Sequence, residues 1–125
     1  MASILHKQNV VRVLVIDAQT IAASGSYTSD PVNLNFLASD GVFSLHYVIT
    51  GNGTAKFEYL MLNEATGTYI EPSEATDIGT GKTVGNDILS FTPVVGRMIK
   101  IKAIETGAAN TVTITAYLKI GRAHV

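Results

Sequence analysis

The chain has 125 residues and a formal net charge of -1; 46% of its residues are hydrophobic and 15% are charged. This length suits one domain with one core, and the apolar content excludes a disordered chain. The balanced charge argues against a nucleic-acid partner, which would call for a broad basic surface. The chain has no cysteine, which excludes disulfides, a thiolate nucleophile and cysteine-ligated zinc.

β-Branched residues are abundant, with 12 Val, 12 Ile and 14 Thr, and they favour strands over helices. No window shows a sustained helical period. The sequence therefore predicts an all-β fold, a single antiparallel β-sandwich or small jelly-roll-like barrel of about eight strands. We expect an N-terminal arm over residues 1–9, the domain over residues 10–120 and a tail over residues 121–125. No apolar run is long enough for a membrane helix and the arm lacks a signal-peptide pattern, so we expect no membrane partner.

The first predicted strand covers residues 10–18 and is apolar at nearly every position except Arg12. Such a continuous apolar run is typical of a strand covered on both faces. A small, polar stretch follows over residues 19–31 and ends in the turn signal Asp30-Pro31. A short strand is expected over residues 32–36.

The clearest local pattern predicts a hairpin of residues 42–50 with residues 54–62 around Gly51-Asn52-Gly53, with Gly53 in the left-handed position. Alternation assigns one face of this hairpin to the core. Its core residues would be Phe43, Leu45, Tyr47, Ile49, Ala55, Phe57, Tyr59 and Met61. On the other face the predicted register places His46 opposite Glu58.

A long connection over residues 63–86 and a strand over residues 88–91 lead to a second predicted hairpin, residues 97–105 with residues 110–120. Its core face would carry Ile99, Ile101, Ala103, Val112, Ile114 and Ala116. Its other face would carry Lys100, Lys102, Thr113, Thr115 and Tyr117. This second set is either a solvated surface or a candidate interface that docks on an acidic surface.

Charge is unevenly distributed along the chain. Residues 57–87 contain six acidic residues against Lys82, a net charge of -5, and residues 97–125 contain five basic residues against Glu105, a net charge of +4. These segments are either two differently charged faces of one domain or complementary patches that steer subunits into register. Within the acidic segment, Glu71, Glu74 and Asp77 could be a carboxylate pair for catalysis, a cation site, part of an interface or a solvated loop.

Other motifs carry little chemistry. Residues 79–83 (Gly-Thr-Gly-Lys-Thr) resemble part of a phosphate loop, but the required earlier glycine is replaced by Thr76 and no helix is expected to follow. His6, His46 and His124 share no ligand-like spacing. A sugar-binding sandwich needs exposed aromatic rings, and the chain has no Trp. The exposed rings that remain are Tyr27, Tyr69 and Tyr117.

Several strand and turn motifs between residues 10 and 120 carry a family resemblance. They are Val13-Leu14-Val15-Ile16-Asp17-Ala18-Gln19-Thr20, Ala22-Ala23-Ser24-Gly25-Ser26, Thr50-Gly51-Asn52-Gly53-Thr54-Ala55-Lys56, Glu71-Pro72-Ser73, Leu89-Ser90-Phe91-Thr92-Pro93, Ile99-Lys100-Ile101-Lys102 and Glu105-Thr106-Gly107. With them the chain resembles the small β-sandwich auxiliary virion structural proteins of tailed bacteriophages. None of these motifs is a catalytic signature.

The resemblance implies a non-enzymatic virion protein that is made in the host cytoplasm, first of all a capsid decoration (cement) protein that binds across neighbouring capsid subunits. Its partners would be the major capsid protein or other virion proteins and further copies of itself. A neck, tail or baseplate component and a carbohydrate- or cell-surface-binding module are the alternatives. An enzyme is disfavoured because no acid, base and nucleophile set converges in the sequence. We expect no catalytic residue, no cofactor and no metal.

Overall fold

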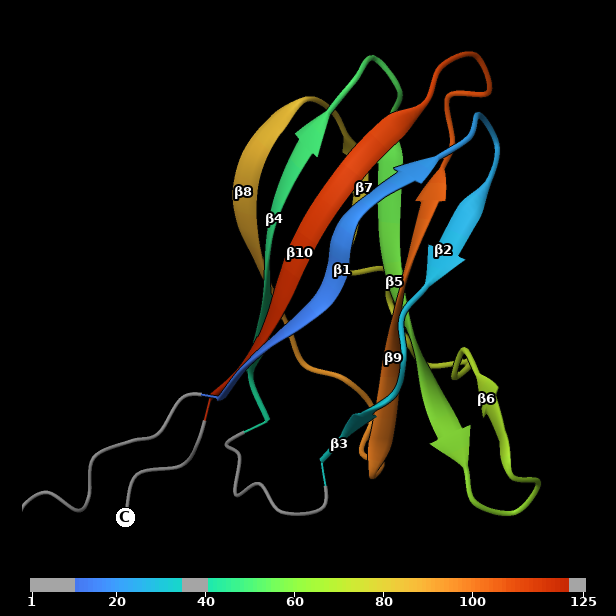
Figure 1. Cartoon of the computed structure of the whole chain (residues 1–125). Helices are drawn as coiled ribbons and strands as arrows, with labels where there is room; N and C mark the ends of the chain where they lie inside the picture. Colours follow the sequence, from blue (N-terminus) through green and yellow to red (C-terminus); the bar gives the residue numbers. More distant parts are fainter. Residues whose placement is uncertain (1–10, 35–40, 122–125) are drawn as a thin grey trace, which may run out of the picture.

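Two antiparallel sheets lie face to face in the computed structural model, which describes residues 11–34 and 41–121 (Figure 1). The predicted arm and most of the predicted tail lie outside the described residues. The strands are β1 (Val11–Ile21), β2 (Ser26–Thr28), β3 (Val32–Asn33), β4 (Phe43–Thr50), β5 (Ala55–Asn63), β6 (Thr68–Ile70), β7 (Gly79–Lys82), β8 (Gly85–Phe91), β9 (Met98–Glu105) and β10 (Val112–Ile120).

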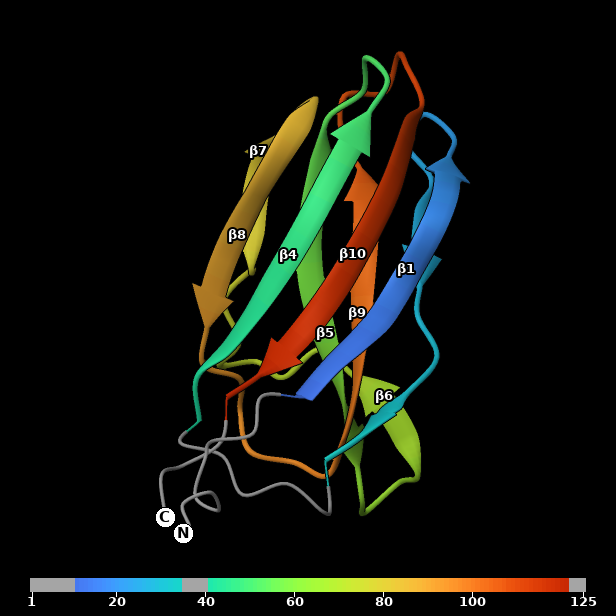
Figure 2. The ribbon, with the colours of Figure 1, turned by 60° about the vertical axis from the view of Figure 1, so that its left-hand side comes forward.

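One sheet has four strands in the order β1-β10-β4-β8, and Figure 2 shows them side by side. The other sheet has the order β2-β9-β5-β6, with β3 also paired to β9 and β7 also paired to β5. The described residues contain no helix, so none of them forms a helix that could cross a membrane. The prediction of an all-β sandwich is confirmed.

Both predicted hairpins are wrong, because each pairs strands that belong to different sheets. β4 pairs with β10 and β8, whereas β5 pairs with β9, β6 and β7. Likewise β9 and β10 lie in opposite sheets. Two strands that face each other across a core bury alternate residues just as two strands of a hairpin do, so alternation cannot distinguish them.

The predicted core residues are confirmed. All eight apolar residues assigned to the core face of the first predicted hairpin are buried, and so are the six assigned to the second. Across the core, the rings of Tyr47 on β4 and Phe57 on β5 have centroids 5.0 Å apart. This contact joins the two sheets at the centre of the sandwich.

The predicted double coverage of the first strand is wrong. β1 alternates between buried and exposed positions, and Arg12 and Leu14 are exposed. The strand also runs on to Ile21, past a bulge in which Ala18 has a φ of 50° and donates its backbone N–H to Thr115 Oγ1 at 3.1 Å. The bulge lets a run of apolar residues serve an edge strand with one open face.

Three short strands lie in segments predicted as connections, namely β2, β6 and β7. Each pairs only at the margin of the six-stranded sheet. They have only three or four residues each, and β7 is half glycine, so none is long enough to show a periodic apolar pattern. The predicted left-handed position of the 51–53 turn is also wrong, because Gly51 has the positive φ, 97°, and Gly53 does not.

Candidate interaction faces

The outer face of the four-stranded sheet, which we call the four-strand face, carries a row of residues that crosses all four strands. Leu14 on β1 is in register with Tyr117, Tyr117 with His46, and His46 with Ile88 on β8. Leu14 is 42% exposed and Ile88 is 58% exposed. With Val48, also exposed, this central row gives the face an apolar stripe that no other part of the described chain covers.

A polar row runs beside the central row. Arg12 is in register with Lys119, Lys119 with Ser44, and Ser44 with Ser90. The Arg12 guanidinium carbon lies 5.2 Å from the centroid of the Tyr117 ring. Neither Arg12 nor Lys119 forms an ion pair within residues 11–34 and 41–121. We call this row the basic row, because it presents the two cations Arg12 and Lys119 next to the exposed apolar side chains of the central row.

His46 lies at the centre of the four-strand face, and its predicted position opposite Glu58 is wrong because the two residues belong to different sheets. His46 Nε2 and Ser44 Oγ are 3.1 Å apart. Two shallow depressions of about 290 and 370 Å³ adjoin His46. Lys119 and Ser90, on either side of β4, line the first, and Asn86 and Ile88 of β8 line the second. The face is hollowed enough to receive side chains from a partner.

The five residues predicted to share one candidate interface are divided between two faces. Thr113, Thr115 and Tyr117 belong to the four-strand face, where Thr113 Oγ1 lies 2.9 Å from Thr20 Oγ1. Lys100 and Lys102 belong to the outer face of the six-stranded sheet. The division follows from the placement of β9 and β10 in opposite sheets.

On the six-stranded sheet, the two lysines lie beside different residues, and neither forms an ion pair within the described residues. Lys102 is in register with Glu58, and the Lys100 ammonium lies 4.3 Å from the centroid of the Tyr69 ring. Since cations cover one side of both Tyr69 and Tyr117, neither ring offers two open faces to a sugar. Tyr27 packs against the core.

The candidate acidic residues lie on the side of the six-stranded sheet, opposite the four-strand face. Ligand oxygens of Glu58, Glu71 and Asp77 lie within 4.8 Å of one another. The ammonium of Lys56 lies 3.4 Å from Glu58 Oε2 and 3.8 Å from Asp77 Oδ2. Asp77 first, and then Glu58, raises the pKa of Lys56. Lys56 thus supplies the positive charge that a cation would bring to this cluster.

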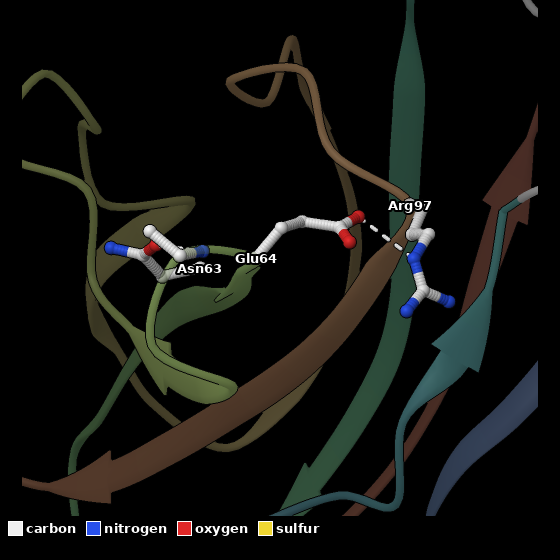
Figure 3. A network of polar contacts seen from close by, with 4 residues as sticks. Asn63, Glu64 and Arg97 are labelled. Atoms are coloured by element: carbon white, nitrogen blue, oxygen red, sulfur yellow. Dashed lines mark hydrogen bonds and ion pairs between the residues drawn. The ribbon is translucent and has the colours of Figure 1, made fainter.

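A turn early in the same acidic segment is held by a third ion pair to Arg97, the residue before β9 (Figure 3). Asn63 Oδ1 accepts a hydrogen bond of 2.9 Å from the backbone N–H of Ala65, and Arg97 Nε donates to Glu64 Oε2 at 2.7 Å. Glu71 and Glu74 are exposed beyond this turn. Of the acidic residues in the segment, these two and Asp87 form no ion pair within the described residues.

Sequence reasoning missed the role of Glu105. Its carboxylate is 1% exposed and accepts four backbone hydrogen bonds of 2.8–2.9 Å, from Ser24, Thr54, Gly107 and Ala108. These bonds, led by those from Thr54 and Ser24, lower the pKa of Glu105 to about 2. The carboxylate ties together the β1–β2, β4–β5 and β9–β10 loops at one end of the sandwich (Figure 1). The sequence signal for this role is a single acidic residue, Glu105, at the end of a strand and two positions before Gly107.

The partial phosphate-loop motif has a different explanation. Gly79–Lys82 forms β7, which pairs with β5, and the next element is the strand β8. No helix N-terminus follows it to bind phosphate.

Comparison with known proteins gives no family from sequence: no family model matches, and no curated protein is detectably similar. The fold is similar to a chain of infectious bursal disease virus strain Gt, with a TM-score of 0.55 and 9% identity over 93% of this chain and 32% of that one. A chain of the infectious bursal disease virus VP2 subviral particle gives a TM-score of 0.52 and 13% identity, over 93% of this chain and 33% of that one.

A third similar structure holds the CBM22-1–GH10 modules of endo-1,4-β-D-xylanase 10B from Clostridium thermocellum, complexed with xylohexaose. It gives a TM-score of 0.51 and 14% identity, over 90% of this chain and 24% of that one. The present chain spans about a third of the length of the viral chains it matches. At these identities the similarities show a shared β-sandwich fold.

Proposed function

We propose that this protein is a non-enzymatic structural component of a virus particle, first of all a capsid decoration protein of a tailed phage. It would bind across neighbouring subunits of the particle surface, and its site of action would be the virion. The proposal joins the family resemblance of the strand and turn motifs to a fold of the kind that chains of virus particles also adopt.

The observation that carries the proposal is the four-strand face. A central row that carries the exposed apolar side chains of Leu14 and Ile88 lies beside a basic row on the outer surface of the sheet. Exposed large apolar side chains gathered on one face mark a protein–protein contact. A ligand site for a small molecule would be an enclosed pocket with converging polar groups instead.

The rigidity of the sandwich supports the same role. Glu105 holds three loops at one end through four hydrogen bonds, and the Tyr47–Phe57 contact holds the sheets together at the centre. A rigid module loses little conformational freedom when it docks. Many identical weak contacts on a symmetric particle then add up to firm attachment.

A catalytic role has no support in the described residues. His46 contacts Ser44, but no carboxylate is seen to orient the ring. The clustered carboxylates of Glu58 and Asp77 are engaged by Lys56. A hydrolase would need a nucleophile, a base and an orienting group in contact.

The proposal is tested by mass spectrometry of particles purified from cells that encode this chain. Hundreds of copies in each particle would support a decoration protein, and a few to dozens would indicate a neck, tail or baseplate component instead. Absence from purified particles would overturn the virion role. A glycan array with the purified protein tests the carbohydrate-binding alternative.

A further inference from the structure

We propose that copies of this chain dock head to tail, with residues 64–77 of the acidic segment of one copy seated on the four-strand face of the next. This contact between copies deepens the proposed function, and it rests on that function only in placing the copies on a virus particle. The chemistry of the contact comes from the two surfaces themselves.

The first observation is that the cations of the four-strand face have no carboxylate partner in the described chain. The three ion pairs of the described residues all lie on the six-stranded sheet, and none includes Arg12 or Lys119. Asp17 lies five positions further along β1 than Arg12, roughly 16 Å away at strand spacing. The two cations therefore favour an acidic partner from outside the molecule.

The second observation is that the acidic segment carries matching chemistry. Glu71 and Glu74 are exposed, and neither is in an ion pair within the described residues, although Glu71 lies in the cluster around Lys56 and helps to raise the pKa of that lysine. Ile70 is 44% exposed, but it is in register with Met61 and therefore lies on the core side of β6, away from Tyr69 and Glu71 on the outer side. The match between the two surfaces is therefore one of charge, with the carboxylates of the segment reaching Arg12 and Lys119 of the next copy.

The two surfaces cannot meet within one copy. Glu71 clusters with Glu58 on the outer side of the six-stranded sheet, whereas Arg12 and Lys119 face out from the four-stranded sheet. The whole core lies between them. Contact between two different patches is heterologous, so it leads to rings or filaments rather than a twofold dimer.

The test is sedimentation velocity of the purified protein at two salt concentrations, with two reciprocal double variants. We expect wild type to form oligomers that shrink as salt rises. Arg12→Glu with Lys119→Glu should sediment as a monomer, and so should Glu71→Lys with Glu74→Lys. An equimolar mixture of these two variants should regain oligomers, because each supplies the surface that the other lacks.

The control is Lys82→Glu on β7 of the six-stranded sheet, which reverses one positive charge outside residues 64–77 and outside the four-strand face and should leave the oligomers intact. Circular dichroism checks that each variant is folded. If a double variant does not fold, a single variant replaces it: Lys119→Glu for the four-strand face and Glu74→Lys for the acidic segment. Monomeric wild type at both salt concentrations, or a mixture that stays monomeric, would overturn the head-to-tail contact. Binding of the monomer to particles, measured separately, would still leave the proposed function standing.

Discussion

The carboxylate of Glu105 on β9 accepts a hydrogen bond of 2.9 Å from the backbone N–H of Thr54. Thr54 is the last residue of the loop between β4 and β5. Glu105 and Thr54 thus join two of the connections that cross between the sheets at this end of the sandwich, the β4–β5 and β9–β10 loops. A second bond, from Thr106 N–H to the Thr54 carbonyl at 2.9 Å, reinforces the junction. The end of the molecule is built around one buried charge.

Replacement of Glu105 by Gln should change the acid stability of the fold. The pKa of Glu105 is lowered from 4.5 to about 2, so folding favours the charged form. Its contribution is complete above about pH 4.5 and is lost as the pH falls towards 2. The melting temperature of wild type should therefore fall as the pH is lowered through that window. Glu105→Gln should have a lower melting temperature at pH 7 and a smaller change of melting temperature over the same window.

The control for this profile is Glu74→Gln, since Glu74 is exposed. It should keep the wild-type dependence on pH. If Glu105→Gln matched wild type at pH 7 and at pH 2.5, the carboxylate would not hold the three loops.

Tyr47→Ala should lower the free energy of unfolding by about 3–5 kcal/mol, because loss of a large core side chain leaves a cavity. Tyr47 is 7% exposed and contacts Phe57 across the sandwich. Urea denaturation followed by circular dichroism measures the change, with Tyr69→Ala on the outer surface as control. An unaltered midpoint for Tyr47→Ala would contradict the placement of this ring in the core.

Gly53→Ala should lower the free energy of unfolding by about 1–3 kcal/mol through overpacking. A Cβ at this position would lie 2.8 Å from Val112 Cγ1, 2.9 Å from the Asn110 carbonyl oxygen and 3.0 Å from Glu105 Oε2. Asn52→Ala, one residue earlier and exposed, is the control in the same urea titration. Equal stability of the two variants would mean that the loops do not approach so closely.

Ile88→Ser should weaken self-association and leave folding unchanged. The side chain is 58% exposed at the end of the central row, so it contributes to a contact rather than to the core. Sedimentation and thermal unfolding measure the two effects. Val84→Ser removes another exposed apolar side chain, outside the four-strand face, and should change neither. A full-sized assembly formed by Ile88→Ser would exclude the central row from the contact.

The fold class and most core residues could be predicted from the sequence because burial follows a period of two along β4, β9 and β10. The alternation from Phe43 to Ile49 and from Ile99 to Ala103 identified the right faces. Partner strands could not be predicted, since strands opposed across a core and strands paired in one sheet share that period. The candidate face failed for this reason: it joined Lys100 to Tyr117, which lie on opposite sides of the molecule.

Part of the candidate contact could be predicted from the distribution of charge along the sequence. The acidic and basic segments were visible as sequence blocks, but the row that pairs Arg12 with Lys119 joins residues at the two ends of the domain. Only the pairing of β1 with β10 brings them together. The hydrogen bonds of Glu105 depend on three loops far apart in the chain and could not be read from any one of them.

The most direct test of the four-strand face as the contact surface is thiol labelling, since the chain has no cysteine. Ser90→Cys places one thiol on this face, and Ser26→Cys places one on the outer face of the six-stranded sheet; both positions are exposed. Labelling rates are compared between dilute protein and protein assembled or bound to particles. The four-strand contact predicts strong protection of the thiol at position 90 and none at position 26. Equal labelling of both thiols in the assembled state would contradict it.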